Sequence, residues 1–139
     1  MLILIDTSVW SLALRRQERD LNPEEKRISG ELRHLIEEGR AQLIGPVRQE
    51  LLSGIREAAQ YERLRRQLRG FPDTPLETTD FEHAARSGNQ CRAAGVAGSL
   101  VDFLICAIAI QRNWPIFTID HDFRGYAKIL PIKLHAPRE

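Results

Sequence analysis

Four carboxylates spread along the chain, Asp6, Glu50, Asp102 and Asp120, could together hold a metal ion for phosphate chemistry. Asp122 supplies a fifth acid. Carboxylates gathered in a partly buried site repel one another, so a cation is needed to keep all of them ionised. Their oxygen atoms suit the hard ions Mg²⁺ and Mn²⁺ rather than zinc. Such an ion could activate water, polarise a phosphoryl group and stabilise the leaving oxygen.

Each acid also has an ordinary structural interpretation. The alternatives are a helix cap for Asp6, a capping partner of Ser99 for Asp102, an exposed helix residue for Glu50, and turn residues for Asp120 and Asp122. The hydroxyl residues beside the acids, Thr7, Ser8 and Thr118, could hold water or backbone groups. His121, between two of the acids, could contact substrate or metal, and a solvated turn residue is the favoured interpretation.

Strand and helix patterns alternate along the chain and would bring these acids together. Strands are predicted at residues 2–5, 41–45, 115–119 and 130–134, with a weak one at 74–79. Helices are predicted over 8–16, 22–39, 46–55, 57–70, 79–95, 99–112 and 123–127; Asn22 caps the second, and Thr79 with Glu82 forms a capping box for the fifth. Helical crossovers between strands imply a mostly parallel sheet. Ligands bind at the carboxyl ends of such strands, which is where the acids fall.

The expected fold is therefore a three-layer α/β/α domain with a mostly parallel central sheet, formed as a single domain by residues 1–139. The apolar run at residues 2–5 would be the central strand, because it has no polar face.

Composition favours a nucleic-acid partner and argues against a membrane protein. Arginine supplies 17 of the 20 basic residues, and its forked donors suit phosphates. The longest apolar run, residues 103–110, is far shorter than the roughly 20 residues that a membrane span needs. No signal segment is apparent, and the two cysteines are expected to be reduced core residues. A cytoplasmic location is expected.

Four segments resemble the successive motifs of PIN-domain ribonucleases. They are "LIDTSVW" at residues 4–10, "VRQELLSG" at 47–54, "SLVDFLICAIA" at 99–109 and "FTIDHDF" at 117–123. Their order, their spacing and the length of the chain resemble in particular the VapC toxins of toxin–antitoxin modules.

This resemblance implies a Mg²⁺- or Mn²⁺-dependent endonuclease that cleaves RNA. By the same resemblance, the four carboxylates named first match the metal-binding acids of the family. Asp122 matches a fifth acid that often plays a lesser part, and Ser8 and Thr118 match hydroxyl positions beside the acids. The family also implies a homodimer and a cognate antitoxin that silences the enzyme.

Three arginines near the acidic motifs, Arg15, Arg16 and Arg48, are candidates for contacts to the RNA backbone. Two other functions stay open from sequence. One is a housekeeping RNA-processing nuclease of the same fold, and the other is a non-catalytic domain that binds a metal or a phosphate.

Overall fold

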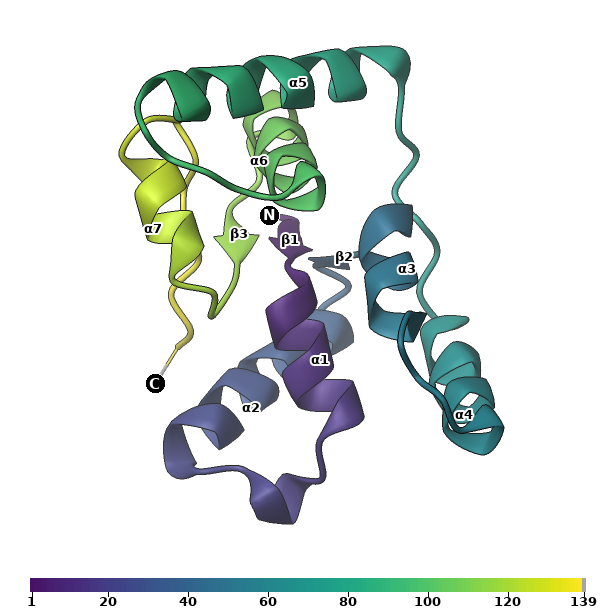
Figure 1. Ribbon diagram of the computed structural model, residues 1–139. Helices are drawn as coiled ribbons and strands as arrows, with labels where there is room; N and C mark the ends of the chain where they lie inside the picture. The colour runs from purple at the N-terminus through teal and green to yellow at the C-terminus, as the bar shows by residue number, and fades with distance from the viewer. Residues whose placement is uncertain (139) are drawn as a thin grey trace.

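The computed structural model describes residues 1–138, and its centre is a sheet of three parallel strands in the order β2-β1-β3 (Figure 1). The strands are β1 (Ile3–Ile5), β2 (Ala41–Gln42) and β3 (Ile116–Phe117). Leu4 of β1 pairs with Gln42 on one side and with Ile116 on the other. Parallel strands end at one edge of a sheet, so Asp6 and Asp120 follow β1 and β3 at the same edge. The predicted parallel α/β architecture is confirmed.

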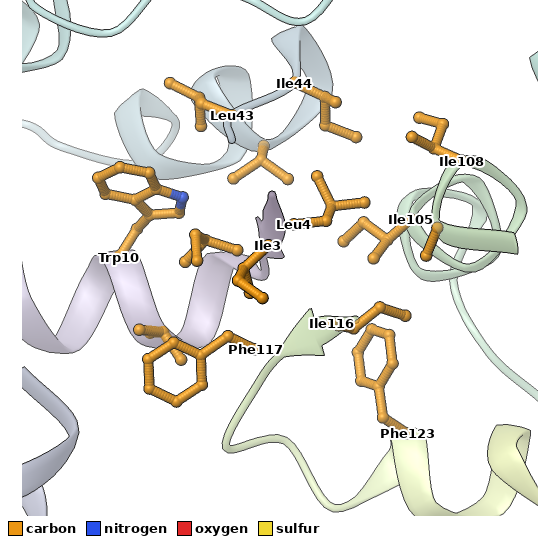
Figure 2. Close-up of a cluster of buried hydrophobic side chains, with 14 of the residues drawn as sticks. Ile3, Leu4, Trp10, Leu43, Ile44, Ile105, Ile108, Ile116, Phe117 and Phe123 are labelled. Atoms are coloured by element: carbon orange, nitrogen blue, oxygen red, sulfur yellow. The ribbon is translucent and has the colours of Figure 1, made fainter. Parts of the chain in front are cut away.

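The central strand is buried on both faces, as its apolar sequence predicts. Ile3, Leu4 and Ile5 are each at most 1% exposed. Figure 2 shows Leu4 directed towards Ile105 of the helix that covers one face, while Trp10 of another helix lies on the opposite side of the strand. Helices on both faces of β1 make the three layers.

The helices and their bounds are α1 (Thr7–Arg15), the 3₁₀ helix η1 (Glu18–Asp20), α2 (Pro23–Glu37), α3 (Gly45–Leu52), α4 (Ala58–Leu68), α5 (Thr78–Ala93), α6 (Leu100–Arg112) and α7 (Asp122–Ala127). The predicted start of α2 is confirmed: Asn22 and Glu25 form a reciprocal capping box, and Pro23 occupies the first turn. Among the described helices, none is long and apolar enough to cross a membrane.

Two predicted strands are wrong. Residues 74–79 form no strand: the chain makes a single bridge between Leu43 and Asp73, and Pro75 then removes a backbone donor. Residues 130–134 likewise form only one bridge, between Ile116 and Leu134, after Pro131. Both segments run beside the sheet without extending its ladder.

The predicted capping box of α5 is also wrong. Glu77 and Asp80 form it, instead of Thr79 and Glu82. Asp80 is only 2% exposed, because its carboxylate also accepts hydrogen bonds from Gln111 and Arg112 of α6. The contact between α5 and α6 therefore decides where α5 begins, and no local pattern carries that information.

Candidate metal-binding active site

Asp6 lies where β1 ends and α1 begins, and it is 4% exposed. Its Oδ2 atom accepts hydrogen bonds from the Ser8 hydroxyl at 2.6 Å, the Ser8 backbone N–H at 3.3 Å and the Thr118 hydroxyl at 2.8 Å. Asp6 is thus both the cap of α1 and a buried acid at the sheet edge. The two interpretations of this residue are compatible.

Ser8 and Thr118 connect the segments that follow β1 and β3. Their hydroxyl oxygens are 3.3 Å apart. The Ile119 backbone N–H donates to the Ser8 hydroxyl, and the Asp120 backbone N–H donates to the Thr118 hydroxyl. The loop that carries Asp120 is therefore positioned by hydroxyl groups beside Asp6.

Three carboxylates converge at this edge. Asp102, Asp120 and Asp122 each offer an oxygen, and these atoms all lie within 4.8 Å of one another. Asp102 comes from the first turn of α6, where its backbone N–H also donates to the Ser99 hydroxyl at 3.0 Å. Asp122 is the first residue of α7, and its backbone N–H donates to the Asp120 carboxylate. The acidic group thus joins the start of α6 to the segment that leads from β3 into α7.

The surroundings of Asp102 disfavour its ionised form when no cation is bound. Burial raises the pKa of Asp102 above its usual value, and the negative charges of Asp6 and Asp120 raise it further. Hydrogen bonds from Tyr126 and Ser99 act in the opposite direction. A divalent cation would relieve this repulsion, and an all-oxygen ligand set fits Mg²⁺ or Mn²⁺.

Glu50 lies outside this group of three. It is an exposed residue of α3, and its Oε1 atom accepts a hydrogen bond from the Thr7 hydroxyl at 2.6 Å. Both residues line a pocket of about 480 Å³, together with Pro46, Gln49, Ser53 and Val101. Thr7 follows Asp6 and Val101 precedes Asp102 in the chain, so residues next to two of the acids contribute to this pocket.

Tyr126 is a site residue that no motif predicts. Its hydroxyl donates to Oδ2 of Asp102 at 2.7 Å, and the residue is fully buried. The available signal is the spacing: Tyr126 follows Asp122 by four positions, which places both on one side of a helix. By contrast, His121 is exposed, in agreement with its interpretation as a solvated turn residue.

The guanidinium of Arg48 is held by contacts within the protein. It donates to the Asp73 carboxylate at 2.9 Å, to the Leu68 carbonyl at 2.9 Å and to the Phe71 carbonyl. These contacts tie α3 to the end of α4 and engage three of the five N–H donors of the guanidinium, so a contact of Arg48 with RNA stays a prediction. Arg16 pairs with Glu25 at 2.7 Å and is half-exposed, and Arg15 is exposed.

The fold and this acid site define a PIN-domain protein, and the chain belongs to that family: residues 3–129 match its model, described as "PIN domain". Within the family, the chain belongs with the VapC proteins. It is 32% identical over 130 residues to Ribonuclease VapC11 of Mycobacterium tuberculosis, an alignment that covers 92% of this chain and 93% of that relative.

Two solved structures share the fold. The structure of FitAcB from Neisseria gonorrhoeae superposes with a TM-score of 0.74 at 22% identity over 98% of each chain. VapBC2 from Rickettsia felis, which was solved bound to a DNA fragment, superposes with a TM-score of 0.71 at 15% identity over 97% of this chain and 98% of that one.

Proposed function

We propose that this protein is a metal-dependent endoribonuclease, hydrolysing RNA phosphodiester bonds as the toxin of a toxin–antitoxin module. The observation that carries the proposal is the approach of Asp102, Asp120 and Asp122 to within 4.8 Å of one another, beside the buried Asp6. The name of the relative, Ribonuclease VapC11, supports RNA as the substrate.

Asp102, Asp120 and Asp122 would hold Mg²⁺ or Mn²⁺. Asp6 would be the buried acid next to them, at the junction of β1 and α1. The ion, when bound, supplies activation of the water and polarisation of the phosphoryl group. The residues of the chain position the acids. The hydroxyls of Ser8 and Thr118 keep Asp6 and the loop after β3 in place.

Glu50 has a different role in the proposed hydrolysis, that of general base. Thr7 holds Oε1 of its carboxylate, and the side chain lies on the wall of the pocket beside the acids. Its second oxygen, Oε2, accepts a proton from water that enters this pocket. A general base must be able to reach the proton that it removes, and an exposed carboxylate fixed at one oxygen meets that requirement.

Positive charge for the RNA backbone comes from exposed arginines. Arg15 remains a candidate, and α4 together with its C-terminal end adds Arg63, Arg66 and Arg69, all exposed at three-residue spacing. These three lie on the side of α4 opposite its buried residues Leu64 and Leu68. Each guanidinium that neutralises a phosphate would contribute to affinity in a salt-dependent way.

The VapC relationship further supports a cognate antitoxin, a homodimer and a cytoplasmic location as parts of the proposal. Growth arrest on expression of the protein, relieved by co-expression of a small protein encoded beside it, would support the toxin assignment. Normal growth with altered RNA maturation would instead favour a housekeeping nuclease.

The decisive experiment measures cleavage of single-stranded RNA by purified protein with Mg²⁺, Mn²⁺ or EDTA. The variant Asp120→Asn is compared with the matched control Asp20→Asn, which removes an exposed acid of η1. We expect cleavage by the wild type and the control, and about 100-fold or greater loss in Asp120→Asn and in EDTA. Undiminished cleavage under either condition would refute the metal mechanism.

A further inference from the structure

The hydroxyl of Tyr126 is buried at the back of the acidic group and is committed to one of its members. Tyr126 is 0% exposed, and its ring packs against Phe103 and Phe123, with ring centroids 5.2 and 5.1 Å away. Its hydroxyl donates to Oδ2 of Asp102 at 2.7 Å. A buried hydroxyl without a partner is unfavourable, so this bond is maintained whenever the ring is in place.

Gly98 makes room for this arrangement. A Cβ atom at position 98 would collide with the Tyr126 hydroxyl, and it would lie 2.8 Å from Cζ of Phe103 and 2.9 Å from Cε1 of Tyr126. Both ring contacts are shorter than real Cβ contacts, so a side chain at position 98 would force one of the rings to shift. The absence of a side chain at position 98 thus allows the phenol to reach Asp102.

The helix that carries Tyr126 also carries Asp122. Asp122 begins α7 and Tyr126 lies one turn further on, so one short helix contributes a carboxylate to the group and a donor to a second carboxylate from α6. Oδ2 of Asp102 accepts this hydrogen bond, so Oδ1 keeps its full capacity for a ligand.

We propose that Tyr126 is a positioning residue of the metal site, which fixes the rotation of the Asp102 carboxylate so that one oxygen meets the ion together with Asp120 and Asp122. The inference rests on the proposed metal-dependent function and adds to it a residue that contacts neither ion nor RNA. Without the hydroxyl, Asp102 rotates more freely, and the ordering of the carboxylate has to occur when the ion binds.

The test compares Tyr126→Phe with the matched control Tyr61→Phe, which removes a hydroxyl from α4. Isothermal titration calorimetry measures the dissociation constant for Mn²⁺ in the absence of RNA. We expect it to rise about 10-fold in Tyr126→Phe, as for other groups that orient metal ligands, and to stay within twofold in the control. In cleavage assays, the Mn²⁺ concentration for half-maximal rate should rise by a similar factor, with a smaller change in the rate at saturating Mn²⁺.

A second variant tests the position of the phenol ring rather than the presence of its hydroxyl. Gly98→Ala retains the hydroxyl but crowds the ring, so it should weaken Mn²⁺ binding in the same direction. Mn²⁺ binding by Tyr126→Phe within twofold of the wild type would overturn the inference while the proposed function stands. A wild type that binds no Mn²⁺ would refute the proposed function, and this inference with it.

Discussion

Thr7 donates its hydroxyl hydrogen to Glu50 over 2.6 Å and so connects the first residue of α1 to α3 across 43 positions of sequence. Glu50 is the one predicted acid that lies outside both the buried edge of the sheet and the group of three carboxylates. The hydrogen bond from Thr7 is what fixes it beside them. The conformation of this exposed carboxylate therefore depends on a single neighbouring hydroxyl.

Replacing Thr7 with valine should lower cleavage without unfolding the protein. Valine keeps the shape of the side chain but cannot donate to Glu50, so we expect a decrease in kcat of about 10-fold from the looser carboxylate. The lost bond is exposed and contributes only about 1 kcal/mol or less to folding. RNA cleavage and thermal unfolding measure the two effects. Thr78→Val, at the exposed first residue of α5, is the control, and equal activity of the two variants would contradict the assigned role of Thr7.

Asp102→Asn should stabilise the metal-free protein while abolishing its activity. Burial and the charges of Asp6 and Asp120 raise the pKa of Asp102, so the folded state binds this proton more tightly than the unfolded chain does. A carboxyl of this kind removes stability as the pH rises from its unfolded pKa through its raised folded pKa. Asparagine carries no charge and can still accept from Tyr126.

The measurement is thermal unfolding in EDTA at pH 7, where we expect the midpoint of Asp102→Asn to lie a few degrees above that of the wild type. Added Mn²⁺ should reverse the order, because only the wild type gains stability from the ion. A lower midpoint in EDTA would mean that repulsion among the carboxylates is not the dominant effect.

Arg48 and Arg15 should give opposite phenotypes. Arg48→Met leaves the carbonyls of Leu68 and Phe71 without their donor, so we expect a loss of about 1–3 kcal/mol in the free energy of unfolding and no change in the salt dependence of RNA binding. Arg15→Ala should leave folding unchanged and weaken RNA binding. Its plot of log affinity against log salt should become shallower by about 0.7. Urea denaturation and fluorescence anisotropy distinguish the two, and a reduced salt slope in Arg48→Met would identify it as an RNA contact.

Low pH should destabilise the packing of the C-terminal segment, because Glu31 becomes protonated. This side chain of α2 is 2% exposed, and its carboxylate interacts with His135 at 2.7 Å and with Arg138 at 2.7 Å. Burial opposes ionisation, but hydrogen bonds and charges from these two residues outweigh it, and the pKa of Glu31 lies below its usual value. A lowered folded pKa gives stability that is present above the unfolded value of about 4.5 and is lost as the pH falls below it.

The free energy of unfolding of the wild type should therefore fall more steeply between pH 5 and pH 3 than that of Glu31→Gln, in urea titrations at a series of pH values. Glu18→Gln, an exposed acid of η1, should reproduce the steep wild-type profile. Parallel profiles for wild type and Glu31→Gln would exclude Glu31 as a source of the acid sensitivity.

The local chemistry of the sequence predicts much of the fold and the acids. The buried strand β1, the capping box at Asn22 and the carboxylates at strand ends each follow from a few adjacent residues. The errors come from partners that are distant in sequence. The predicted capping box at Thr79 and Glu82 is wrong because Glu77 is the N-cap of α5, and its partner Asp80 also accepts hydrogen bonds from α6. Tyr126 is invisible as a site residue for the same reason.

The bridge between Ser8 and Thr118 joins residues 110 positions apart and has a consequence for the time course of synthesis. The ribosome synthesises Asp6 early. Thr118, Asp120 and Asp122 lie much later in the chain and are added only after α1 to α6. Until then the nascent polypeptide contains β1 but lacks the segment after β3 that completes the acidic edge of the sheet. A product that stops short of Asp120 would lack two of the three converging carboxylates, so the proposed cleavage of RNA requires translation through Asp122.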